Sequence, residues 1–91
     1  MLEKQIERKL TEEVKKRAGM CLKQTGIAGI PDRLILLPEK KSAFVELKRP
    51  GEKPRRLQEI RMKQIKKMGY EVFVIDGVEQ IGRLLDEVQS S

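Results

Sequence analysis

The sequence predicts an α/β fold in which helices flank a small mixed β-sheet, and three observations support this class. Apolar residues near the start recur every four positions, which indicates an amphipathic helix. The middle of the chain holds short apolar segments of strand length with turn-forming residues between them. A basic helix then lies between two such segments, and a strand–helix–strand crossover makes those two strands parallel. The expected order is α-β-β-β-α-β-α within one domain, residues 1–91.

The first element is a helix from Leu2 to about Arg17, which Gly19 ends because glycine adopts the left-handed conformation readily. Its apolar stripe consists of Leu2, Ile6, Leu10 and Val14. A short strand is expected over Met20–Lys23. The segment TGIAGIP, residues 25–31, is expected to be a loop because of its glycines and its proline.

Two apolar strands are expected next, over Arg33–Leu37 and Ala43–Leu47, joined by the turn-like segment PEKKS. Pro50 and Gly51 end the second of these strands. Pro54 then opens a helix to Met68, since proline is well tolerated in a first helical turn. The residues of this helix expected to face inward are Leu57, Ile60, Ile65 and Met68, and Gly69 ends it.

The last strand, Tyr70–Ile75, is apolar on both faces apart from Glu71, which predicts an interior or near-interior position in the sheet. It should run parallel to the strand that begins at Ala43. Asp76 and Glu79 resemble a capping box for a final helix. The buried positions of that helix are expected to be Val78, Ile81, Leu84, Leu85 and Val88.

The composition excludes several classes of function. Apolar residues make up 38% of the 91 residues and charged residues 37%, and the chain has no histidine and one cysteine, Cys21. These counts exclude His-based triads, zinc sites and an intrachain disulfide. No stretch approaches the ~20 apolar residues of a membrane span. The sequence therefore predicts a cytoplasmic protein with no membrane partner.

The net charge of +6 is concentrated in residues 48–67, a segment that contains nine cations and only two glutamates. Two interpretations fit this segment: it binds a polyanion such as DNA or RNA, or it is the solvated face of a lysine-rich helix. Aromatic residues make up only 3% of the chain, so stacking on aromatic side chains is not an expected way to hold bases.

The strand segment AFVEL carries a carboxylate, Glu46, and is followed by an ammonium, Lys48, although a core strand normally excludes charge. Residues two apart share a strand face, so Glu46 and Lys48 project together with Phe44, while Val45 and Leu47 face the other layer. An aspartate, Asp32, precedes the neighbouring antiparallel strand. It lies on the Glu46 face only if paired residues have an even index sum, which requires a hairpin loop with an odd number of residues, or a bulge.

In that register two carboxylates and one ammonium converge at the end of the sheet. Adjacent carboxylates repel each other unless a cation lies between them. Oxygen ligands favour Mg²⁺ or Mn²⁺, and a backbone carbonyl near Leu47 is a further candidate ligand. Lys48 is then placed to orient or help deprotonate the attacking water, or to stabilise charge on a phosphate. The alternative is an exposed pair on an edge strand, which contributes little energy.

The segment Gly29-Ile30-Pro31-Asp32, followed by the strand segment Phe44–Lys48 (FVELK), resembles the PD-(D/E)xK nuclease superfamily. Within that superfamily the chain is similar to the VRR-NUC family in its compact stand-alone form. The similarity extends to Gln58 on the following helix and to an acidic residue on the first helix, for which Glu3 and Glu7 both qualify. It implies a restriction-endonuclease-like core of order αβββαβ, here with an additional C-terminal helix.

The resemblance implies a role for each of these residues. Asp32 and Glu46 are expected to be metal ligands, Lys48 the catalytic cation, and Gln58 a support for the site or for the scissile phosphate. Either Glu3 or Glu7 would bind metal directly or through water, and Glu3 is slightly preferred. Apart from the resemblance, the basic segment is expected to hold backbone phosphates of DNA through Arg49, Lys53, Arg55, Arg56 and Arg61. Arg33 follows Asp32 and is also expected to contact phosphate; the alternative is that it only extends its charged end from the sheet to solvent.

The function implied is that of a metal-dependent, structure-specific DNA endonuclease, with a Holliday-junction resolvase as the leading interpretation and no small-molecule cofactor. One active centre cuts one strand, so a resolvase should be a homodimer. The expected dimer interface consists of apolar positions left over on the first or last helix. A flap or nicking nuclease is the alternative with the same chemistry, and a non-catalytic DNA-binding module is the alternative without it.

Overall fold

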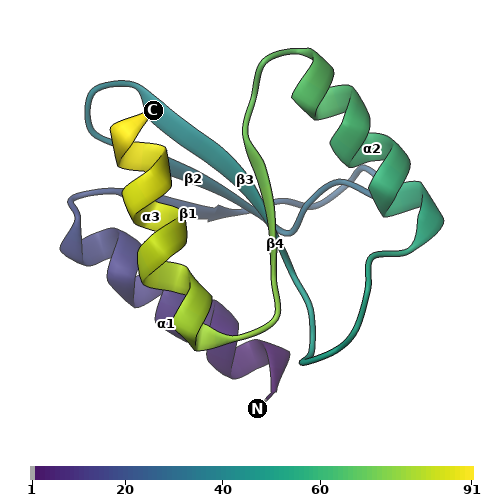
Figure 1. Ribbon diagram of the computed structural model, residues 1–91, viewed down its shortest axis with the longest axis horizontal. Helices are drawn as coiled ribbons and strands as arrows, with labels where there is room; N and C mark the ends of the chain where they lie inside the picture. Colours follow the sequence, from purple (N-terminus) through teal and green to yellow (C-terminus); the bar gives the residue numbers. More distant parts are fainter. Residues whose placement is uncertain (1) are drawn as a thin grey trace.

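The computed structural model describes residues 2–91, and its elements follow the predicted order (Figure 1). The helices are α1 (Glu3–Lys16), α2 (Arg56–Lys67) and α3 (Ile81–Ser90), with a short 3₁₀ turn, η1 (Val78–Gln80), leading into α3. The strands are β1 (Met20–Lys23), β2 (Arg33–Leu37), β3 (Lys41–Leu47) and β4 (Val72–Ile75). None of the helices within residues 2–91 is long and apolar enough to cross a membrane.

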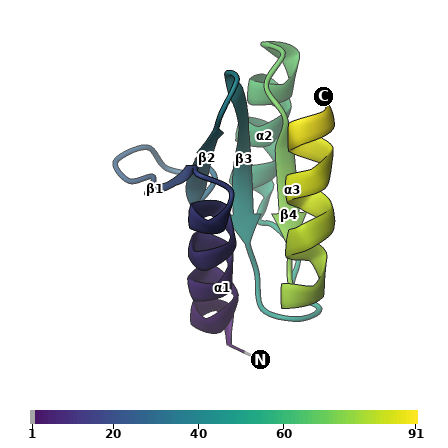
Figure 2. The same ribbon diagram turned by 90° about the vertical axis from the view of Figure 1, so that its left-hand side faces the viewer.

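The four strands form one sheet in the order β1-β2-β3-β4. The β1–β2 and β2–β3 pairs are antiparallel, and the β3–β4 pair is parallel, which confirms the predicted crossover. The predicted interior position of the last strand is wrong, because β4 is an edge strand and its Val74 is 42% exposed. Its apolar pattern reflects the helices on its two faces, α2 and α3, rather than strands on both of its edges (Figure 2).

Helices α1 and α3 lie side by side and cover one face of the sheet (Figures 1 and 2). The core between these layers combines residues from both helices and three strands, and its members are Ile6, Leu10, Val14, Ile35, Leu37, Ala43, Val45, Leu47, Ile75, Ile81, Leu84, Leu85 and Val88. Burying each large aliphatic side chain contributes about 1.5–3 kcal/mol. The predicted apolar stripe of the first helix is right for Ile6, Leu10 and Val14 and wrong for Leu2, which precedes α1 and is 65% exposed. The apolar positions within α1 and α3 are buried in this core, so they do not supply the dimer interface expected on these helices.

Helix α2 lies on the opposite face and contacts the sheet along a narrow line. Only Met62 and Ile65 of this helix are buried. The predicted inward set is therefore right for Ile65 and wrong for Leu57, Ile60 and Met68, which are 42%, 41% and 67% exposed. Leu57 and Ile60 lie on other sides of the helix than the line through Met62 and Ile65, and Met68 lies beyond the last residue of α2.

The turn after β4 is stabilised differently from the predicted capping box. The Gln80 Oε1 atom accepts hydrogen bonds from the backbone N–H groups of Asp76 and Gly77, at 2.7 and 3.2 Å. The Asp76 carboxylate instead accepts a hydrogen bond from the Gly51 N–H at 3.1 Å. The predicted cap is wrong because the Asp76 side chain turns back to the loop that follows β3. It thereby ties the end of β4 to that loop.

Candidate active site

Asp32 and Glu46 lie opposite each other at the end of the sheet. The β2–β3 ladder pairs Arg33 with Val45 and Leu37 with Lys41, so the hairpin loop is the three residues 38–40. An odd loop was the condition for Asp32 to share the face of Glu46, and this condition is met. Continuing the ladder by one residue places Asp32 directly across from Glu46.

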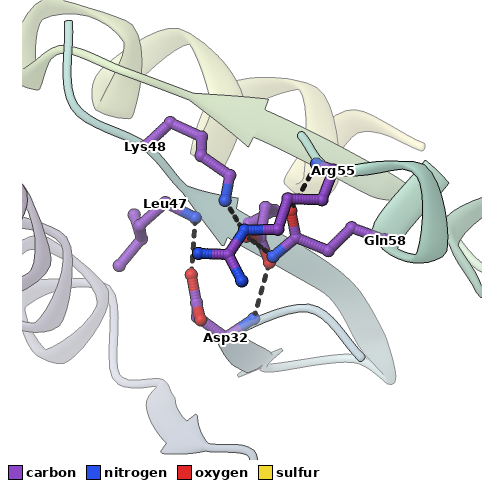
Figure 3. Close-up of polar contacts among 6 residues, drawn as sticks. Asp32, Leu47, Lys48, Arg55 and Gln58 are labelled. Atoms are coloured by element: carbon purple, nitrogen blue, oxygen red, sulfur yellow. Dashed lines mark hydrogen bonds and ion pairs between the residues drawn. The ribbon is translucent and has the colours of Figure 1, made fainter. Parts of the chain in front are cut away.

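Two hydrogen bonds fix the aspartate against strand β3. The Asp32 N–H donates to Glu46 Oε1 at 3.3 Å. The Leu47 N–H donates to Asp32 Oδ2 at 2.9 Å (Figure 3). The second bond holds the Asp32 carboxylate at the carboxyl end of β3, so the carboxylates of Asp32 and Glu46 lie at the same end of the sheet.

The Glu46 carboxylate is held by a cation and an amide. Its Oε2 atom lies 3.0 Å from Lys48 Nζ and accepts a 2.7 Å hydrogen bond from Gln58 Nε2 (Figure 3). The side chain of Glu46 is 1% exposed, and Lys48 is also buried. Burial raises the pKa of the Glu46 carboxyl, the hydrogen bond from Lys48 opposes this rise, and the nearby Asp32 charge adds to it.

Gln58 bridges the site to the start of α2. Its Oε1 atom accepts a hydrogen bond from the Arg55 N–H at 2.8 Å, while its amide nitrogen donates to Glu46. Both ends of the amide are therefore bonded, which fixes its rotamer. In the view of Figure 3 the side chain of Arg55, the residue just before α2, extends toward the cluster. The N-terminal end of α2 thus forms one wall of the site.

The backbone of Leu47 also faces the aspartate. The N–H groups of Phe44 and Lys48 donate to carbonyls of Glu71 and Ile75 on the β4 side, each at 2.9 Å. Strand alternation therefore turns the Leu47 N–H and C=O away from β4, toward Asp32. The Leu47 carbonyl, predicted as a further metal ligand, therefore lies on the side of β3 that faces Asp32.

These groups suit a hard divalent ion. Within residues 2–91, no three acidic or cysteine side chains lie close enough to form a metal cluster by themselves. Two carboxylates with a backbone carbonyl nevertheless fit Mg²⁺, which usually takes one or two carboxylates and completes its shell with water and substrate phosphate. A cation would also relieve the repulsion between Asp32 and the buried Glu46. Asp32, Glu46 and the Leu47 carbonyl are the groups that would hold it.

Of the two first-helix glutamates, Glu3 is half-buried and forms no ion pair within residues 2–91, whereas Glu7 is paired with an arginine. Glu7 forms an ion pair with Arg33, with Oε1 2.9 Å from Nη2. Arg33 also donates from Nη1 to the Cys21 carbonyl at 3.2 Å, and its side chain is only 13% exposed. Its strand position places it with Val45 on the face opposite Glu46. Arg33 therefore links α1, β1 and β2, and its guanidinium is not presented to solvent as a phosphate contact would be.

The other residues expected to contact DNA divide into two groups. Arg49, Lys53, Arg55 and Arg56 are exposed. Arg61 is half-buried and donates to the Ala28 carbonyl at 3.2 Å and to Gln64 Oε1 at 3.1 Å. Its position holds the loop before Asp32 against α2.

Sequence reasoning missed a second cationic surface. A groove of about 460 Å³ is lined by Leu2, Glu3, Lys4, Glu7, Lys23 and Arg49. Lys4 and Lys23 were not singled out because they are distant in sequence from the basic segment at residues 48–67. The signal that brings Lys23 here is the strand pairing of β1, which places it opposite Arg33, next to Asp32.

The fold and the site together define a nuclease domain of the PD-(D/E)xK class. The description VRR-NUC domain belongs to the family model that matches residues 2–79. The chain belongs to the VRR-NUC family. It is 42% identical over 76 residues to "Putative nuclease p44" of Acyrthosiphon pisum secondary endosymbiont phage 1, covering 81% of this chain and 82% of that protein. It is also similar to a solved VRR-NUC domain structure, with a TM-score of 0.82 and 29% identity over 92% of this chain and 94% of the other.

Family membership makes this chain a nuclease, and nuclease domains of this class generally use divalent metal ions. The roles of Asp32, Glu46, Lys48 and Gln58 remain predictions that the geometry makes specific. The same is true of Glu3 and Glu7 as ligands and of the DNA-contacting set.

Proposed function

We propose that this protein is a Mg²⁺- or Mn²⁺-dependent, structure-specific DNA endonuclease that acts on branched DNA, with a four-way junction as the favoured substrate. The observation that supports this proposal most strongly is the convergence of Asp32, Glu46 and Lys48 at one end of the sheet, with Glu46 buried and bonded to both Lys48 and Gln58. An isolated structural role does not explain a buried carboxylate beside a second one, because burying charge is costly.

The residues divide the work of phosphodiester hydrolysis. A bound divalent ion supplies stabilisation of the negative charge that develops on the scissile phosphate. Asp32, Glu46 and the Leu47 carbonyl would hold that ion. Lys48, whose ammonium lies 3.0 Å from Glu46, would orient the attacking water or stabilise charge on the phosphate. Gln58 keeps the Glu46 carboxylate in place through its own two hydrogen bonds.

Cutting both strands of a junction calls for two such sites, so the protein should act as a homodimer. The exposed apolar residues on and just after α2 support an interface there: Leu57, Ile60, Met68 and Tyr70 are each at least 41% exposed. This surface replaces the first and last helices as the candidate interface. Static light scattering at micromolar concentration should give twice the chain mass, and a monomer would favour a flap or nicking nuclease.

The test of the activity is a panel of labelled duplex, single-stranded, flap, splayed-arm and four-way-junction DNA incubated with Mn²⁺ or Mg²⁺. The wild type should make symmetric incisions near the crossover of the junction. Glu46→Ala and Lys48→Ala should abolish cleavage and retain DNA binding, while Glu12→Ala and Lys15→Ala on the exposed surface of α1 should cut at the wild-type rate. Cleavage by both site variants at the wild-type rate would refute the catalytic assignment, and binding without any cleavage by the wild type would indicate a non-catalytic module.

A further inference from the structure

We propose that the groove between the N-terminal end of α1 and Arg49 binds the phosphodiester backbone of the DNA strand as it leaves the active site. This inference rests on the proposed nuclease function. It assigns DNA to a surface that is separate from the basic helix α2 and lies on the other side of the catalytic cluster.

The groove adjoins the site through the sheet itself. Arg49 directly follows Lys48, two residues beyond the end of β3, and it lines the groove together with Lys23 of β1 and Glu7 of α1. Lys23 pairs with Arg33, the residue after Asp32, so the end of β1 reaches the same edge of the sheet. A DNA strand whose scissile phosphate lies at Asp32 and Glu46 therefore has the N-terminal end of α2, with Gln58, on one side and this groove on the other.

The charges of the groove favour an anion. Its three cations, Lys4, Lys23 and Arg49, are exposed and form no ion pair within residues 2–91. Of its two acidic residues, Glu7 is neutralised by Arg33 at 2.9 Å. Glu3 remains, so unpaired positive charges outnumber unpaired negative ones three to one.

The shape and lining of the groove favour a backbone rather than bases or an apolar ligand. It is open, its volume is about 460 Å³, and five of its six lining residues are charged. No aromatic side chain is among them, so it offers no surface on which a base stacks. Contacts between lysine or arginine and phosphate position a strand without reading its sequence, as a structure-specific enzyme requires.

The experiment measures DNA binding in EDTA, where no cleavage occurs, by fluorescence anisotropy with a junction whose cut position has been mapped with the wild type and Mn²⁺. Neutral methylphosphonate linkages replace phosphates on the 5′ side of the cut in one set and on the 3′ side in another. The proteins are the wild type, Lys23→Ala, Arg49→Ala and a control, Lys15→Ala, which removes a cation from the other end of α1. Thermal unfolding confirms that each variant is folded.

We expect Lys23→Ala and Arg49→Ala each to lower the slope of log affinity against log salt by about 1. On one side of the cut only, methylphosphonates should weaken DNA binding by the wild type and by Lys15→Ala. The same linkages should cause no further loss of affinity in Lys23→Ala and Arg49→Ala. Wild-type affinity and salt slope in both groove variants would overturn the proposal. It would also be overturned if the effect of the methylphosphonates depended on Lys23 and Arg49 on neither side of the cut, or equally on both sides. Failure of the wild type to cleave any substrate would instead refute the nuclease function, so the two outcomes are distinguishable.

Discussion

Replacing Glu46 and Lys48 together by neutral residues of similar size should give a protein at least as stable as the wild type that does not cleave DNA. The two side chains are 1% and 9% exposed, and their charged atoms are 3.0 Å apart. Taking both charges out of water costs several kcal/mol per ion, which their attraction offsets only in part. Neutral replacement of such a pair is typically neutral or stabilising by about 1–4 kcal/mol, whereas removing one partner costs about 3–5 kcal/mol.

The assay is thermal unfolding in EDTA at neutral pH for Glu46→Gln, Lys48→Met and the double variant. For a chain of this length 1 kcal/mol corresponds to about 5 °C in Tm, so each single variant should lose about 15 °C or more while the double variant unfolds at or above the wild-type Tm. All three should fail to cleave junction DNA with Mn²⁺. A double variant that loses the sum of the two single losses would refute the reasoning, because it would mean that the two charges do not interact.

Three further predictions concern the site and its supports. In EDTA, the free energy of unfolding of the wild type relative to that of Glu46→Gln should fall as pH rises from the ordinary glutamate pKa toward the raised pKa of Glu46. The reason is that the native state binds more protons than the unfolded chain in that pH range. A difference between the two proteins that is constant with pH would contradict this. Exchanging the charges of Glu7 and Arg33 (Glu7→Arg with Arg33→Glu) should recover most of the stability that either single change loses, with a coupling of about 0.5–3 kcal/mol in a double-mutant cycle; zero coupling would show that the ion pair does not hold α1 to β2. Gly29→Ala should lower both Tm and cleavage, because φ is +81° and the added Cβ would lie 2.7 Å from Leu57 Cγ, beside Gln58. Gly26→Ala is its control, with φ +96° and open space around it, so that it should lose only the ~1–2 kcal/mol of the left-handed conformation; equal losses in the two variants would contradict the packing argument.

The sequence predicted most of the sheet and the central pair of carboxylates. Alternation along the strand set Glu46 and Lys48 on one face and Val45 and Leu47 on the other, and the structure confirms this division. The parity argument specified an odd hairpin loop but not its length. Three residues form that loop, with Glu39 and Lys40 in the left-handed region at φ 66° and 61° without the glycine that usually signals such a turn.

Sequence patterns failed where tertiary contacts determine which of several similar side chains is buried, or in which direction a side chain points. Leu57 and Ile60 are as apolar as Ile65, but α2 contacts the sheet along one line only, and nothing in its sequence fixes the rotation of the helix. Arg33 was expected to contact DNA because it follows Asp32. Its orientation depends on Glu7 and the Cys21 carbonyl, which lie 26 and 12 positions away in sequence.

A titration with Mn²⁺, followed by electron paramagnetic resonance of the unbound ion, tests most directly whether the carboxylate of the loop before β2 and that of β3 share a divalent ion. The wild type should bind Mn²⁺ saturably. Asp32→Asn and Glu46→Gln should each weaken that binding at least about tenfold, because even the loss of a residue that only supports a metal ligand typically costs about 10–100-fold in affinity. Glu12→Gln, a carboxylate removed from the exposed surface of α1, should bind as the wild type does. Unchanged Mn²⁺ affinity in both Asp32→Asn and Glu46→Gln would contradict the account.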